Sequence, residues 1–451
     1  FLRVQDELRK AMDAGHMTTS YAGGGTGGSL IPQSIENTLA WATLQNRHIK
    51  LWNMVPKAAD RLTATVHEYS RQNTIGPELE GWGAEGVLGP TVDSEVERLY
   101  QKCRYLSHVR DVTDPMSQVS ILGPSPNAVA KVTSDASLYM LKMLESSLFD
   151  GDSDVNPDSI DGLYHYCSGA GNVYDNRGDA ISSRILYDVV STLMDPPIYG
   201  FPDGILMPVK VQTDLALIGG DQVRFRGAQE SESGNVKIGV RATRLIGPME
   251  DVPFTPSVFL APKGGPASSA IGTNPPATPT ATVTVTDSET SLFRTRDAGT
   301  YKIQLVAVGT NGEKSAPLTI DDVAIAAGQI ATIAIDAPGI NNVKYYIAYR
   351  SEVGGSSTYE IRRFRQTFLS GSPAATTFVD VNRYIPNTSR VYVVQQTPDV
   401  MQWKQLLDFA RIPLAKTRLS QPYAFVLYGM LLSEVPQKLY CIENVGRLSG
   451  V

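Results

Sequence analysis

Histidine and cysteine, the residues most often used for metal binding and nucleophilic chemistry, are scattered through this chain. No His-Glu-x-x-His motif occurs, and no cysteine stands at ligand spacing from a histidine. The histidines are His16, His48, His67, His108 and His165. The three cysteines, Cys103, Cys167 and Cys441, form no Cys-x-x-Cys pair and are odd in number, which favours folding in a reducing cytoplasm. We therefore predict no metal site.

Carboxylates are crowded in one segment, where alternating acidic side chains could bind calcium. They are Asp150, Asp152, Asp154, Asp158 and Asp161. The glycine and the terminal glutamate of an EF-hand loop are not in register with them. A solvated loop after a helix is therefore the favoured interpretation, with a calcium site as the alternative.

Two further catalytic or nucleotide-binding patterns are missing. The glycine cluster from Gly23 to Gly28 is not followed by the Gly-Lys-Ser/Thr of a phosphate-binding loop. No Gly-x-Ser-x-Gly nucleophile motif occurs. We predict no catalytic residue and no cofactor, and we interpret the glycine cluster as part of an extended arm.

The composition is that of a folded protein with two to four compact units. The chain has 451 residues, 42% hydrophobic content and a net charge of −6, which excludes a general attraction to nucleic acid or anionic lipid. No apolar run is long enough to span a bilayer, and the charged start lacks a signal-peptide core. A start at Phe1 instead of Met indicates proteolytic trimming or a missing leader, and both alternatives stay open.

A long hairpin is predicted between Arg61 and Arg110. Two strand-like runs, Leu62 to Tyr69 and Val96 to Val109, flank a segment rich in glycine and proline. Such a hairpin is marginally stable alone in water, so we expect it to pack on a neighbouring subunit.

The same hairpin is acidic. From Asp60 to Gln101, eight carboxylates face three arginines, and no lysine occurs. The acidic side chains either keep the loop soluble or pair with basic groups on the next subunit, and the sequence leaves both readings open. Trp82, at the tip, is the predicted interface anchor, while Trp403 at helical spacing is predicted to be core and Trp52 is undecided. The candidate intersubunit contacts are Trp82, Glu78, Glu80, Glu85 and Arg71.

Helical periodicity predicts four helices. They cover Gln33 to Ile49, the stretch after Ser125-Pro126 up to Gly151, Asp179 to Leu193, and the region of Trp403 to Ala410. The second is the longest, with Ser125 as the expected N-cap. Strand-like pieces are predicted up to Leu260, then at Ala424 to Leu432 and Lys438 to Ile442.

Between these parts lies a segment of different character. A linker rich in Gly, Pro, Ala, Ser and Thr runs from Pro262 to Pro279, and a second is expected to end near Asn387. Short alternating runs fill the space between them, with a hairpin turn at Asn311-Gly312. This pattern predicts an antiparallel β-sandwich.

The order of these elements resembles the major capsid proteins of tailed bacteriophages with the Hong Kong 97-type fold. The most similar stretches are Leu148 to Gly151 with Asn156-Pro157 and Ile160 to Leu163, Gly247 to Pro262, Trp403 to Ala415, and Glu434 to Gly446. The inserted segment resembles a fibronectin type III or immunoglobulin-like module through Gly299 to Ser315 and Val343 to Arg350, although it has no tryptophan and reverses the usual strand order.

The resemblance implies an α+β Hong Kong 97-like capsid fold with an inserted all-β sandwich. Its expected parts are an N-terminal arm and first helix (1–58), an extended hairpin loop (59–114), a spine helix with peripheral and axial capsid core (115–262), the insert with its linkers (263–395), and a return to the core (396–451).

The resemblance also implies a structural protein of the virion that self-assembles in the host cytoplasm. The expected partners are other copies of the chain in hexamers and pentamers, nonspecific packaged double-stranded DNA, and possible decoration, scaffolding and portal proteins, with no membrane. Some members of the family cross-link through a lysine of the hairpin, which is absent here. The alternatives are an adhesin whose sandwich binds carbohydrate, and a hydrolase with an accessory binding domain.

Overall fold

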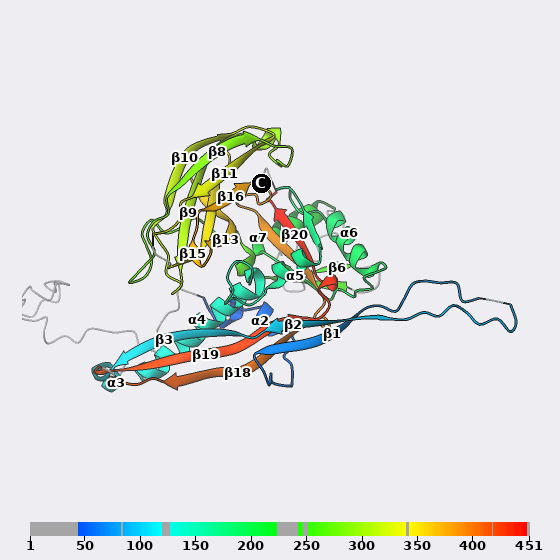
Figure 1. Cartoon of the computed structure of the whole chain (residues 1–451), viewed down its shortest axis with the longest axis horizontal. Helices are drawn as coiled ribbons and strands as arrows, with labels where there is room; N and C mark the ends of the chain where they lie inside the picture. Colours follow the sequence, from blue (N-terminus) through cyan, green and yellow to red (C-terminus); the bar gives the residue numbers. More distant parts are fainter. Residues whose placement is uncertain are drawn as a thin grey trace, which may run out of the picture.

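The computed structural model describes residues 44–82, 84–119, 127–222, 242–246, 251–339, 342–416 and 418–448. Its elements form three parts: a core of helices and two sheets, a long projecting hairpin, and two further sheets that lie over the core (Figure 1). No helix within these ranges is long and apolar enough to cross a membrane.

The longest helix, α4, runs through the core. It spans Ala128–Asp150, a length of about 35 Å. Its N-cap is Asn127, whose side chain accepts a hydrogen bond from the backbone N–H of Val129, so the predicted cap at Ser125 was wrong. Serine and asparagine are equally good caps, and the sequence does not choose between two of them placed two residues apart.

Two sheets complete the core. One has the order β18-β19-β3, with β3 at Arg104–Thr113. The other has the order β4-β20-β17-β5-β7-β6. Its strands are β4 Val173–Asp175, β20 Tyr440–Val445, β17 Ser389–Val394, β5 Gly204–Met207, β7 Asp251–Pro256 and β6 Arg244–Ile246.

The region of Trp403 predicted as a helix is the strand β18, Met401–Pro413. It pairs along most of its length with β19, Ser420–Ser433. The register of this pair shifts twice between Gln405 and Ala410. Because a bulge interrupts the two-residue alternation of side chains, the apolar residues here fall at a spacing that imitates a helix.

Two longer helices flank the six-stranded sheet. The helix predicted from Asp179 to Leu193 is confirmed as α6, Ser183–Met194. The helix α7, Val209–Gln222, replaces predicted strand-like pieces. Its buried residues Val211 and Leu215 lie one turn apart, but the β-branched valines gave the segment a strand-like composition. The shorter helices are α2 Leu51–Met54, α3 Asp114–Gln118, α5 Leu163–Gly169, η2 Asn46–His48, η3 Val258–Leu260, η4 Thr295–Asp297 and η5 Pro436–Lys438.

The helix predicted from Gln33 to Ile49 lies mostly outside the described residues. In its described part only the 3-10 turn η2 forms, and Ile49 is extended, so the prediction is wrong there. The chain instead turns so that the backbone N–H groups of residues 50–52 reach the side chain of Glu145 on α4.

Two antiparallel sheets lie over the core. Their strand orders are β10-β9-β12-β13 and β16-β11-β8. The strands are β8 Ala281–Asp287, β9 Gly299–Gly309, β10 Leu318–Ile325, β11 Gln329–Ile335, β12 Val343–Ser351, β13 Thr358–Arg365 and β16 Thr376–Asp380. The short strands β14 Phe368–Leu369 and β15 Ser372–Pro373 pair only with each other, as a small hairpin. One apolar cluster, which includes Leu305, Ile333 and Phe378, joins the two sheets. We call residues 263–388 the insert.

The strand β17 was assigned to the insert by the predicted boundary at residue 395. It pairs instead with β5 and β20 of the core sheet, so the core resumes at Ser389. The run from Val391 to Val394 is completely buried, which is typical of a strand in the centre of a sheet.

The predicted hairpin consists of β1, Val66–Thr74, and β2, Glu95–Lys102, which pair antiparallel. The strand predicted from Val96 to Val109 is two strands, because the chain leaves β2 at Cys103 and enters β3 of another sheet. The hairpin projects from the core in the direction away from the insert (Figure 1).

Candidate intersubunit contact site

The hairpin tip, residues 75–94, exposes large apolar side chains to solvent. Leu88 is 95% exposed, Trp82 is 92% exposed and Ile75 is 86% exposed. These side chains are flanked by polar and glycine residues that offer them no cover. An exposed apolar group of this kind marks a protein-binding surface.

Four of the five predicted contact residues gather at this tip. Glu78, Glu80 and Glu85 are exposed, as is Trp82. The fifth, Arg71, lies on β1 and is used within the hairpin. Its Nη2 lies 3.1 Å from Oε2 of Glu97, and its Nε donates to the side chain of Asn73 at 2.9 Å.

The base of the hairpin is held by the core. The side-chain amide of Gln101 donates to the carbonyl of Leu431 at 2.9 Å. On the other strand, His67 Nε2 lies 3.1 Å from Nζ of Lys404. Partial burial and this lysine lower the pKa of His67. The hairpin is therefore anchored to the core at its base, whereas its tip makes no hydrogen bond or ion pair to the core within the ranges that the structure describes.

A second surface, which the sequence reasoning missed, is a cleft of about 1080 Å³ between the insert and the core. One wall is formed by the C-terminal half of α4 and by α5, and the other by β12 and β13. Asp150 on α4 forms ion pairs with Lys263 and Arg390 inside it. Burial alone would raise the pKa of Asp150, but these two cations hold it well below its ordinary value.

Basic residues of the insert also line this cleft. Arg363 pairs with Glu360, 2.7 Å away. Lys314 and Arg365 make no ion pair or side-chain hydrogen bond within the described part of the chain, and Arg362 lies only over the ring of Tyr384, at 5.8 Å. Burial and the neighbouring Arg363 lower the pKa of Lys314. The run of Arg362, Arg363 and Arg365 was visible in the sequence as the one signal for this surface.

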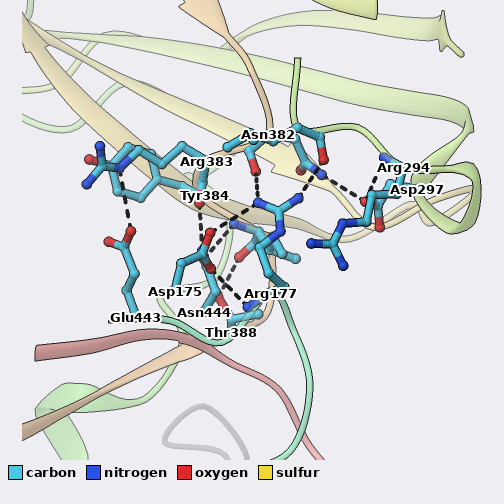
Figure 2. A network of polar contacts seen from close by, with 12 residues as sticks. Asp175, Arg177, Arg294, Asp297, Asn382, Arg383, Tyr384, Thr388, Glu443 and Asn444 are labelled. Atoms are coloured by element: carbon cyan, nitrogen blue, oxygen red, sulfur yellow. Dashed lines mark hydrogen bonds and ion pairs between the residues drawn. The ribbon is translucent and has the colours of Figure 1, made fainter. Parts of the chain in front are cut away.

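A polar network fixes the insert on the core beside the cleft (Figure 2). Arg177 donates to Asp175 at 3.2 Å and to the carbonyl of Asn382 at 3.1 Å. The side-chain amide of Asn444 donates to Asp175 at 2.7 Å and to the carbonyl of Arg383 at 2.6 Å.

Further contacts extend this network from the insert to core residues. Arg383 Nε lies 3.5 Å from a carboxylate oxygen of Glu443, and Arg296 donates to Asp179 at 2.9 Å. These groups hold the two parts in one orientation.

The acidic segment after α4 is largely paired inside the chain. Asp158 forms an ion pair with Lys344 of the insert. Asp152 and Asp161 lie beside His165, and the hydrogen bond that the imidazole donates to Asp152 raises the pKa of that histidine although burial opposes it. A loop does follow α4, as predicted, and Asp158 on it is exposed, but Asp152 and Asp161 are partly buried. The ligand atoms of Asp152, Asp161 and His165 lie within 4.8 Å of one another, close enough to hold a metal ion, so the calcium alternative stays open.

We compared the sequence with those of known proteins. No protein-family model matches the chain. A putative major capsid protein of Enterococcus phage phiEF24C is 26% identical over 77% of this chain and 76% of the relative. The major capsid proteins of Staphylococcus phages S25-3 and K are each 21% identical over 93% of this chain and 90% of the relative. This chain is a major capsid protein of a phage head. An adhesin role, the alternative left by the sequence, is not favoured.

Solved structures with a similar arrangement were also found. The capsid of a native GTA particle has a TM-score of 0.47 at 10% identity and covers 94% of this chain and 99% of that one. The capsid of Myoviridae phage XM1 has a TM-score of 0.44 at 10% identity and covers 91% and 96%. As a capsid protein, the chain is part of the virion.

The capsid protein ties its N-terminal segment to α4 through one carboxylate. Glu145 is completely buried and accepts hydrogen bonds from the backbone N–H groups of Lys50, Leu51 and Trp52, at 2.8 to 3.0 Å. Trp52 in turn packs edge to face against Trp403, with ring centroids 5.1 Å apart. The prediction that Trp403 is a core residue is confirmed, since its side chain is buried. Trp52, which the sequence left undecided, packs against it.

Proposed function

We propose that this capsid protein is a building block without catalysis that assembles into the hexamers and pentamers of an icosahedral head around double-stranded DNA. The observation that carries the proposal is the hairpin tip. It exposes Trp82 and Leu88 almost completely, while the base of the same hairpin is anchored to the core.

A subunit with such a tip gains stability by association. Burying apolar surface contributes about 25 cal/mol per Å² removed from water. Each subunit in a closed shell has several neighbours, so many modest contacts act together and the shell holds although each contact alone is weak. The tip of each copy would therefore be covered by an adjacent copy.

The arrangement of parts supports a Hong Kong 97-like fold. The hairpin, the spine helix α4 and the central sheets follow one another as expected for that family. We assign residues 59–103 to the extended loop, 104–262 together with 389–451 to the capsid core, and 263–388 to a fibronectin- or immunoglobulin-like insert. The strand β3 belongs to the core because it pairs with β19. Decoration, scaffolding and portal proteins are further partners of such a shell. Contact with the packaged DNA would be nonspecific and local, because a net charge of −6 gives the whole subunit no attraction to nucleic acid.

No lysine lies between Asp60 and Gln101, so the shell would hold without isopeptide bonds from this loop. Purified particles boiled in denaturant are expected to run as a single subunit band. A ladder of covalent oligomers would contradict this.

Electron microscopy of the expressed protein tests the assembly proposal. The wild-type chain is expected to form closed shells. Two variants separate contact from folding: one replaces residues 75–94 by Asn-Gly, and a matched one keeps their number but makes them all Gly and Ser. Both are expected to give folded subunits, with circular dichroism close to wild type, and no shells. Shells of normal yield from both variants would overturn the proposal.

A further inference from the structure

The cleft between insert and core contains cations that form no ion pair within the described part of the chain. Lys263 and Arg390 form ion pairs with Asp150, and Arg363 forms one with Glu360. Lys314 and Arg365 remain without an ion pair or side-chain hydrogen bond among the described residues.

Lys314 lies in this cleft beside Arg363 and Lys263; burial, followed by repulsion from these two cations, lowers its pKa. An entering carboxylate would relieve this repulsion, so the cleft is suited to an anionic group.

The wall of the cleft also offers apolar surface. Met143 of α4 and Tyr105 of β3 line it and are 42% and 55% exposed. Tyr345 and Ile347 line it from the insert. A suitable occupant therefore combines carboxylates with large apolar side chains and is longer than a single ion.

The hairpin tip has this composition. Between residues 75 and 94 there are four acidic residues, Glu78, Glu80, Glu85 and Asp93, and no lysine, arginine or histidine. Trp82 stands among the glutamates, and Leu88 follows. In the arrangement of Figure 1 the hairpin points away from the insert, so a tip could reach such a cleft only on a different copy.

The geometry points to the cleft between insert and core as the receptor for the acidic hairpin tip of a neighbouring copy of this chain. The glutamates Glu78, Glu80 and Glu85 lie against Lys314, Arg362 and Arg365, and Trp82 covers the apolar wall near Met143. This inference rests on the proposed assembly and names the surface that assembly uses. The insert then has a role in the shell lattice, because it supplies one side of a joint between subunits.

Cysteine pairs test the contact directly. Glu78, Glu80 and Glu85 are each replaced by Cys and combined with Arg362→Cys or Arg365→Cys, and assembled particles are oxidised and run on a non-reducing gel. At least one combination is expected to give a ladder of linked subunits that reductant abolishes. Lys302→Cys, on a strand of the same sheet but outside the cleft, is the matched control and is expected to give no ladder with the same tip cysteines.

Charge reversal tests the energetics. Arg362→Glu with Arg365→Glu is expected to lower particle yield about tenfold, which corresponds to the loss of about 1.4 kcal/mol per contact. Glu78→Lys with Glu80→Lys is expected to do the same, and the combination of both pairs to restore yield. Arg294→Glu, a reversal on the insert outside the cleft at a side chain with no ion pair among the described residues, is expected to leave the yield unchanged.

The outcomes separate this inference from the assembly proposal. If wild type forms shells but no cysteine combination cross-links, or if both reversals assemble normally, the cleft is not the receptor, and a decoration protein or a small anion becomes its occupant. If wild type forms no shells at all, the assembly proposal itself fails.

Discussion

The hairpin tip and the joint between insert and core are both rich in charged side chains. The two regions differ in whether these side chains form ion pairs within the chain. At the joint, the carboxylates Asp150, Asp158 and Glu443 are all paired with basic groups of the same chain. At the tip, Glu78, Glu80 and Glu85 make no ion pair or side-chain hydrogen bond within the described part of the chain. The glutamates and the tryptophan of the tip are exposed to solvent.

This difference shows how one chain divides its interactions between folding and assembly. Charges paired at close range and partly removed from solvent fix the orientation of two parts, since separating them would leave desolvated charges without partners. Exposed charges contribute little to the stability of the chain itself, but they steer and select a partner. Variants of the paired charges should therefore change the free energy of unfolding of the subunit, whereas variants of the tip should change particle assembly. The expected loss of subunit stability decreases from Arg350 to Trp82.

The largest effect is expected at Arg350. Its side chain is 1% exposed, forms an ion pair with the buried Asp380 and lies over the rings of Phe293 and Tyr301, at 5.0 and 5.1 Å. Arg350→Ala leaves Asp380 buried without its partner, so the free energy of unfolding should fall by about 3–5 kcal/mol. Urea unfolding of the full-length subunit measures this.

The matched control for Arg350 is Arg365→Ala, because Arg365 is exposed and makes no ion pair or side-chain hydrogen bond with the described residues. It should change stability by no more than about 0.5 kcal/mol. Equal losses from the two variants would remove the distinction between charges that are paired inside the insert and charges that are open to the cleft.

A smaller, pH-dependent effect is expected at Asp150. Its folded pKa lies below the ordinary value of 3.8, so its contribution to stability is present above that pH and is lost as the pH falls further. Asp150→Asn should cost about 1–3 kcal/mol at pH 7, because Lys263 and Arg390 lose a charged partner.

The difference between wild type and Asp150→Asn should narrow in unfolding experiments as the pH falls below about 4. There the Asp150 carboxylate of the unfolded chain binds a proton while the ion pairs of the folded chain oppose protonation, so their contribution to stability shrinks. A difference that stays constant down to the acid limit of folding would show that the two ion pairs do not stabilise the joint. Asp154→Asn, on the same acidic loop but with no side-chain ion pair in the described residues, serves as the control.

Much of the fold could be predicted from the sequence where local patterns were regular. The helices α4 and α6, the hairpin and the alternating strands of the insert all follow apolar periodicity. The failures have physical causes. The bulges in β18 give its apolar residues a helix-like spacing, so this strand was predicted as a helix. The valines of α7 favour a strand by composition, so this helix was predicted as strand-like.

The candidate site divides in the same way. The tip was predictable because its unusual composition is contiguous in sequence. The cleft was not, because Asp150, Lys314 and Arg365 come from separate elements that meet only in the folded chain. Arg71 had the expected charge, but a sequence cannot show that Glu97 on the opposite strand is its partner.

The smallest effect on the subunit is expected from Trp82→Ala. Its ring is 92% exposed, so removing it should change the free energy of unfolding by no more than about 0.5 kcal/mol. Trp403→Ala, in contrast, empties a fully packed site and should cost about 3–5 kcal/mol. Particle yield should fall for both variants. Trp403→Ala lowers it because the subunit is less stable, whereas the Trp82→Ala subunit remains as stable as wild type and loses only the contact with its neighbour. A Trp82→Ala subunit that unfolds at lower urea would mean that the tip packs on its own chain, and Trp82→Phe, which keeps a large ring, should recover most of the assembly if the contact is apolar.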